Sequence, residues 1–285
     1  MHVSLDSALG RQRRLNSVGE SVLQIAPNAA AAYSLRSLTG GDPKVVRVRR
    51  DTDGGAGDND EQDFTASEVS SGALAAFVGS GNDGFVETWY DQSGNSKDAT
   101  QATANLQPKI VNAGSLLTDG IDFDGTSQAG LITGSFSLTQ AFTTFSVSHT
   151  DDASSFQGIW STAANTVTNI NSTSFFGNND GFAVTAGNIL TTAGTIDYVA
   201  DRTYLRTNVV NGGSSSIFVD GATGATGNAG STNPSGILIL GYFRSTSYFN
   251  LDGAIKELII YDSDQTSNRA ALETNIAAAN GVTLS

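Results

Sequence analysis

Residues 251–261, LDGAIKELIIY, give the clearest indication of the fold class of this chain. Two shorter apolar runs precede it, IFVDG at residues 217–221 and ILILG at residues 237–241. Each run is short, rich in apolar residues and next to a glycine or aspartate, which is typical of β-strands separated by tight turns. The closing part of the chain is therefore expected to contribute three strands to a sheet.

The rest of the chain repeats this rhythm. Runs such as Phe142–His149 and Tyr204–Val210 are bounded by small polar residues, and neighbouring runs often lie about eight to twelve residues apart. This spacing favours a sandwich or barrel over alternating strands and helices. We expect helices over Thr65–Val78 and Thr266–Ala279, and a short helix or helix-like turn over Ala29–Leu38. The C-terminal helix should pack on the sandwich through Ala270, Leu272, Ile276 and Ala277.

Composition excludes several kinds of chemistry. The chain has 285 residues, which is enough for one large core, and it contains no cysteine, so disulfides, thiolate metal sites and Cys nucleophiles are excluded. There is no continuous apolar stretch of about 20 residues, so we expect no membrane span. We also expect no signal peptide, because no continuous apolar segment follows the weakly apolar start of the chain.

Charge is distributed unevenly along the chain. Residues 1–50 hold eight basic and three acidic residues, a net charge of +5, whereas the remainder holds seven basic and 25 acidic residues, a net charge of −18. An acidic body repels nucleic acid phosphates, so nucleic acid is not an expected partner. The asymmetry indicates that the two parts face different surroundings.

The first 27 residues differ from the rest. Neither a helical nor a strand period holds across them, and they are too short to form a core of their own. We therefore divide the chain into an extended N-terminal docking arm, residues 1–27, and one domain, residues 28–285. The residues expected to dock the arm on a partner are Arg11, Arg13, Arg14 and Leu15.

A resemblance to a known superfamily rests on motifs in both halves. AAYSLR at residues 31–36, VRVRR at 46–50, WYDQSGN at 89–95 and DATQ at 98–101 form a series that precedes the closing strands. Together they resemble the concanavalin A-like or laminin-G-like jelly roll of bacteriophage virion proteins, which is related to the catalytic domain of α-L-arabinofuranosidase B. The resemblance covers about residues 29–284 and implies an all-β, two-sheet jelly-roll sandwich with short helices.

The same resemblance allows a test for enzyme activity. Retaining glycosidases need two carboxylates, and the arabinofuranosidases carry them in an Asp-Met-Glu and a Gly-Gly-Asp segment. The segments that align here, Gly181–Asn188 and Leu240–Ser245, contain no acid, and the nearest later acids, Asp197 and Asp201, do not recreate the motif. We therefore expect no glycoside hydrolysis. In place of carboxylates, the two aligned segments contain Thr185, Asn188, Tyr242 and Arg244.

Two functions follow from these observations. The first is a structural virion protein, a capsid decoration or tail-associated protein exposed on the particle. It would assemble with other virion proteins as a homo-oligomer, with a trimer favoured, and its jelly roll would bind host cell-surface glycans. The alternative is a soluble carbohydrate-active protein, an arabinofuranosidase-like glycosidase or a lectin. The aromatic residues that could stack on a sugar are Trp160, Tyr242 and Tyr248.

Polar clusters give few further candidates. The loop that holds Asp51, Asp53, Asp58 and Asp60 offers oxygen ligands that suit calcium, although acidic glycine-rich loops are usually solvated turns. No other metal or cofactor is expected. We expect Asp91 to pair with Arg47 or Arg49, and His149 to be a polar residue on the face of a strand rather than a catalytic group.

Overall fold

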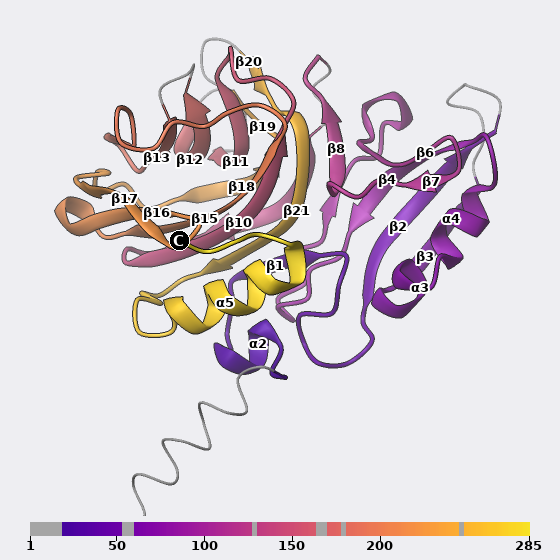
Figure 1. The fold of residues 1–285 in the computed structure, drawn as a ribbon, viewed down its shortest axis with the longest axis horizontal. Coiled ribbons are helices and arrows are strands. Elements are labelled where there is room, and N and C mark those ends of the chain that lie inside the picture. Colours follow the sequence, from indigo (N-terminus) through magenta and orange to yellow (C-terminus); the bar gives the residue numbers. More distant parts are fainter. Residues whose placement is uncertain (1–18, 53–59, 127–129, 164–169, 178–180, 245–247) are drawn as a thin grey trace, which may run out of the picture.

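The computed structural model describes residues 19–52, 60–126, 130–163, 170–177, 181–244 and 248–285 (Figure 1). It confirms the all-β sandwich expected from the sequence, because two sheet layers built from short strands enclose the main core. All of the strand pairings found in these residues are antiparallel. No helix in the described ranges has the length and apolar character needed to cross a membrane.

One layer is centred on β10 (Phe142–Thr150), which pairs with β15 (Arg202–Val210) on one side and β21 (Asp252–Tyr261) on the other. The other edge of β21 is shared by β1 (Ala31–Ser34) and β8 (Ile121–Asp124). The layer continues past β15 into β16 (Ser215–Val219) and β17 (Ala222–Gly227).

The opposing layer contains β11 (Gln157–Ala163) between β18 (Ser235–Leu240) and β12 (Ile170–Gly177). β9 (Leu131–Ser137) extends it beyond β18. On the other side it continues through β13 (Gly181–Thr185) into β14 (Ile189–Thr191), and a separate hairpin is formed by β19 (Tyr242–Arg244) and β20 (Tyr248–Asn250).

A second half of the molecule, on the right in Figure 1, is built from earlier parts of the chain. β4 (Asp83–Trp89) pairs with β2 (Lys44–Asp51), which also pairs with β3 (Glu61–Thr65). The predicted helix over Thr65–Val78 is present as α3 (Ala66–Ser70) and α4 (Ala73–Val78), interrupted at Gly72. The shorter elements are β5 (Ala99–Thr100), β6 (Lys109–Asn112), β7 (Ser115–Leu116) and two 3₁₀ turns, Ala104–Leu106 and Gly212–Ser214.

The predicted C-terminal helix is confirmed as α5 (Arg269–Asn280), which covers the outer face of the β10–β21 layer. Leu272, Ile276 and Ala277 are buried there, but Ala270 is exposed. The short helix α2 (Val22–Ile25) packs beside α5, and the Asn275 side chain donates a hydrogen bond of 2.6 Å to the Glu20 carbonyl. Residues 20–26 are therefore attached to the sandwich.

The expectation of a helix over Ala29–Leu38 is wrong. Residues 31–34 form β1, because their backbone pairs with residues 257–260 of β21, and all four are buried. The paired residues are more than 200 positions apart in the sequence, so the local sequence does not indicate the pairing. Sheet pairing has overridden the weak helical preference of an alanine-rich segment.

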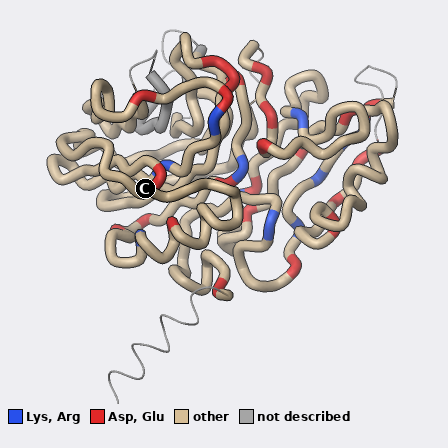
Figure 2. The backbone as a smooth tube through the Cα atoms, in the orientation of Figure 1, with Lys and Arg blue, Asp and Glu red and all other residues tan. Residues whose placement is uncertain are grey.

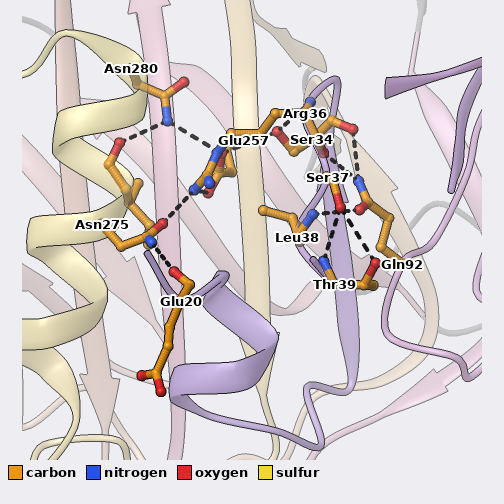
Figure 3. Close-up of polar contacts among 11 residues, drawn as sticks. Glu20, Ser34, Arg36, Ser37, Leu38, Thr39, Gln92, Glu257, Asn275 and Asn280 are labelled. Atoms are coloured by element: carbon orange, nitrogen blue, oxygen red, sulfur yellow. Dashed lines mark hydrogen bonds and ion pairs between the residues drawn. The ribbon is translucent and has the colours of Figure 1, made fainter. Parts of the chain in front are cut away.

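The WYDQSGN motif forms the joint between β1 and β4. The Gln92 amide accepts from the Leu38 backbone at 2.7 Å and donates to the Ser34 and Arg36 carbonyls (Figure 3). Asp91 accepts from backbone groups at Ala32, Ser93 and Lys97. The expected ion pair of Asp91 with an arginine is wrong, since its carboxylate fixes the turn. Arg47 binds Glu61 and Asp63 instead, and Arg49 binds Gln107.

Candidate active site

A row of side chains crosses five strands on one face of the sheet. The register pairs Thr203 with His149, His149 with Ala254, Ala254 with Asp122, and Asp122 with Lys109. Directly opposed residues in antiparallel strands point to the same face, so these five side chains form one line. The small Ala254 lies between His149 and Asp122, and leaves space between them.

This space is a pocket of about 180 Å³, formed by β8, the end of β10, β21 and the loop before β8. Acidic residues lie on β8 and beside the adjoining ends of β10 and β21 (Figure 2). Its lining residues are Leu117, Asp119, Gly120, Asp122, His149, Asp151 and Ala254. Asp124 and Asp252 lie close enough to influence the charge of Asp122.

The carboxyl group of Asp122 is the most strongly perturbed acid among the described residues. Burial raises its pKa to about 6, and the neighbouring charge of Asp151 acts in the same direction, while Lys109 opposes the shift. Asp252 also has a raised pKa, first because of burial and then because of the Asp151 charge. A carboxylic acid with a pKa raised towards neutrality keeps its proton to a higher pH than an ordinary aspartic acid, and groups of this kind donate protons in catalysis.

His149 and Asp151 form the opposite wall of the pocket. The His149 Nε2 atom lies 3.1 Å from Asp151 Oδ1, and Nδ1 lies 3.4 Å from the Thr203 hydroxyl, so both ring nitrogens have a polar neighbour. The Asp151 side chain is 52% exposed, so solvent and a substrate can reach it. Its backbone N–H donates to the Asp252 carbonyl at 2.9 Å, which holds the loop against β21.

Asp201, in the loop before β15, lies close to His149 and Asp151. One ligand atom each from His149, Asp151 and Asp201 lies within 4.8 Å of the others. Imidazole and carboxylate groups at this spacing are able to hold a divalent cation of the transition series. Both aspartates are exposed, and exposed acidic groups are also commonly found together without a bound ion.

A larger pocket of about 720 Å³ adjoins the acidic one. Leu117 and Gly120 line both pockets, so the loop before β8 forms their common wall. The described residues that line the larger pocket include two cations, Arg36 and Lys256, and one acid, Asp42. Gly120 is required in this wall because its φ is +115° and a Cβ would lie 2.5 Å from the Ile255 carbonyl oxygen.

Two of the aromatic residues expected to stack on a sugar are placed differently. Trp160 is fully buried and Tyr242 is only 4% exposed, so neither offers a ring face to a ligand and this expectation is wrong. Trp160 lies opposite Leu240 in the register and belongs to the main core. Tyr242 packs with Ile239. It also lies against Gly130, where the Cβ atom of any larger residue would overlap the tyrosine ring. The Tyr248 side chain lies outside the described part of the structure.

The other sequence candidates are only partly described. Asp60 is paired with Arg50, and Asp51 lies 4.0 Å from an Arg49 nitrogen, so these two carboxylates have cationic neighbours. Asp53 and Asp58 lie outside the described residues, and calcium binding stays a prediction. The arm residues Arg11, Arg13, Arg14 and Leu15 also lie outside them.

Comparison with known proteins gives structural neighbours only, because neither a family model nor a curated protein matches the chain. An arabinofuranosidase complexed with arabinofuranosyl-α-1,2-xylobiose superposes with a TM-score of 0.64 at 16% identity. A GH54 α-L-arabinofuranosidase soaked with a cyclic sulfate inhibitor gives 0.64 at 17% identity. Each alignment covers 88% of this chain and 63% of the other. The chain thus shares the sandwich of these enzymes and spans less than two thirds of their length.

These comparisons correct the expectation of a non-enzymatic virion protein. The structural neighbours reported above are arabinofuranosidases, and they give no support to a bacteriophage, capsid or tail-fibre assignment. The two segments that align with the catalytic motifs contain no acid, whereas Asp122, Asp151 and Asp252 come from three other positions that only the folded sheet brings together.

Proposed function

We propose that this protein is a glycoside hydrolase that acts at the Asp122 pocket. The observation that carries the proposal is the raised pKa of Asp122, about 6, in a pocket that also holds an exposed carboxylate, Asp151. Glycoside hydrolysis needs one protonated and one ionised carboxyl group on either side of the scissile bond. A shared fold with arabinofuranosidases supports this chemistry and makes furanosides the first substrates to test.

The different surroundings of Asp122 and Asp151 suggest a different catalytic role for each carboxyl group. Asp122 is half-buried and keeps its proton up to a pH of about 6, so in that range it would protonate the leaving oxygen. Asp151 is exposed and lies beside the imidazole of His149, so as a carboxylate it would stabilise the positive charge that develops on the sugar or activate water. The volume of the pocket suits a single sugar residue.

The test is hydrolysis of an aryl arabinofuranoside by Asp122→Asn. We expect loss of at least about a hundredfold in kcat/KM, since general acid catalysis contributes typically 10²–10⁴-fold. The same change at Asp197, an exposed acid outside the pocket, is the matched control and should leave activity unchanged. Wild-type activity should fall as pH rises above about 6, because Asp122 then loses its proton.

Full activity in Asp122→Asn would refute the assignment of the proton donor. Absence of turnover by the wild-type chain on aryl furanosides, aryl pyranosides and arabinoxylan would refute hydrolysis itself.

A further inference from the structure

The larger pocket is a groove with a mainly apolar wall. It lies between α3 and the end of α5, and the chain after β1 and the loop before β8 complete it. Leu35, Leu116 and Leu117 belong to this wall and are only half-buried. Apolar side chains that stay partly exposed in one concave surface, of about 720 Å³, indicate a site where a further apolar segment can pack.

The described chain begins beside this groove. The Glu20 carbonyl accepts a hydrogen bond of 2.6 Å from Asn275, whose side-chain oxygen in turn accepts from Arg36 at 3.0 Å (Figure 3). Arg36 lines the groove, and so does Ala279, which lies one helical turn after Asn275 on the same face of α5. Residues 1–18, which lie outside the described structure, therefore join it about one turn of helix from the edge of the groove.

The composition of residues 1–18 suits an apolar groove of this kind. Leu5 and Leu9 supply apolar side chains near the start of the chain. Leu9 is ten residues before Gly19, and an extended chain of that length spans up to about 35 Å. This reach is ample for a groove whose edge is so close to the point where the segment joins the body.

Charges in the groove also match those of the segment. Asp42 accepts hydrogen bonds from the hydroxyl and the backbone of Ser67, at 2.6 and 2.8 Å, which hold the pKa of its carboxyl below the usual range. Within the described residues, neither Asp42 nor Lys256 has an ion-pair partner. The segment brings one acid, Asp6, and an arginine cluster at positions 11–14, so it can complement both charges.

We propose that residues 3–14 dock in this groove of their own chain, with Leu5 and Leu9 against its leucines and an arginine of the segment beside Asp42. Tethering at Gly19 gives an effective concentration in the millimolar range, which favours the segment of the same chain over that of a second copy. The docked segment would pack against Leu117, in the wall that the groove shares with the Asp122 pocket. The proposal does not depend on hydrolysis and is tested without a substrate.

The test is limited trypsin digestion of the full-length protein, with release of the peptides that end at Arg11, Arg13 and Arg14 followed by mass spectrometry. Ala279→Phe places a ring in the groove, and we expect release to become about tenfold faster, because cleavage follows the population of the undocked segment. Ala278→Phe is the matched control, since this neighbouring exposed alanine of α5 does not line the groove, and its rate should equal that of wild type.

A second pair of variants tests the segment itself and does not alter the folded body. Leu5→Ser should speed release by a similar factor, because it removes an apolar contact, whereas Ser4→Ala should not. Equal rates in wild type, Ala279→Phe and Leu5→Ser would overturn the proposal. Protection that is lost on dilution would show that a second copy supplies the segment, which would overturn docking within one chain.

Discussion

At the scale of single residues, the position of Asp122 explains its unusual proton affinity. Its neighbours in the row are Ala254, which cannot hydrogen-bond through its side chain, and Lys109, whose ammonium is 2.7 Å from Asp83. The cation that opposes the shift is thus already paired, while several aspartates lie close. The carboxylate form of Asp122 is therefore disfavoured, which raises the pKa of the group and makes it suitable as a proton donor.

The raised pKa of Asp122 also predicts how the stability of the protein depends on pH. Asp122 has a folded pKa of about 6 against an ordinary value of 3.8, so the folded state holds the proton more tightly and stability falls as pH rises through this range. At full strength the shift corresponds to roughly 3 kcal/mol, which solvent screening reduces to about 1–2 kcal/mol. Asp122→Asn should therefore be more stable than wild type by that amount at pH 7, with no difference below about pH 4.

Urea denaturation at pH 4 and pH 7 measures this difference. A variant that is less stable than wild type at pH 7 would show that Asp122 is stabilised as a carboxylate. This outcome would also remove the physical basis of its role as proton donor.

At the scale of elements, one polar cluster joins β1, β21 and α5. Glu257 on β21 is 1% exposed and accepts hydrogen bonds from Arg36, from the Ser34 hydroxyl on β1 and from Asn280 on α5 (Figure 3). A buried carboxylate is tolerated only when it is paired and its oxygens are satisfied. The cluster therefore fixes the chain after β1 and the end of α5 to the same point of the sheet.

Arg36→Met tests this cluster. The change leaves Glu257 buried without its cation, and we expect the free energy of unfolding to fall by roughly 2–4 kcal/mol, because breaking a buried ion pair on one side typically costs 3–5. Lys44→Met breaks an ion pair whose lysine is 61% exposed, so its cost should stay below about 1 kcal/mol. Guanidinium denaturation curves give both values, and equal costs would contradict the role assigned to Glu257.

At the scale of the whole molecule, the two halves share one core. The main cluster of buried apolar residues contains Trp89 from β4 and Trp160 from β11, which belong to opposite halves of the structure. The sheet is also continuous between them, through β8, β6 and β4. Neither half can unfold without exposing part of the apolar surface of the other.

We therefore expect a single cooperative unfolding transition. The chain has two tryptophans, so Trp89→Phe and Trp160→Phe leave one fluorescent reporter in each half. Within each variant the fluorescence midpoint should coincide with the midpoint from circular dichroism. Separate midpoints for the two signals would show that the halves are independent domains.

The amino-acid sequence was sufficient to predict the class of fold and the C-terminal helix. Strands such as β10 and β21 and the helix α5 are encoded in short-range patterns of apolar residues and turns, which are legible within ten to fifteen residues. It also identified WYDQSGN as unusual, although the role of Asp91 in that turn depends on backbone groups that only the folded chain brings near it.

The candidate site, by contrast, depends on contacts between distant parts of the chain. Asp122, His149 and Ala254 are widely spaced in sequence, and a register fixed by pairing between distant strands places them in one row. The same long-range pairing made residues 31–34 a strand and buried Trp160 in the core. Local sequence cannot carry this information, because register and burial depend on the free energy of contacts between segments far apart in the chain.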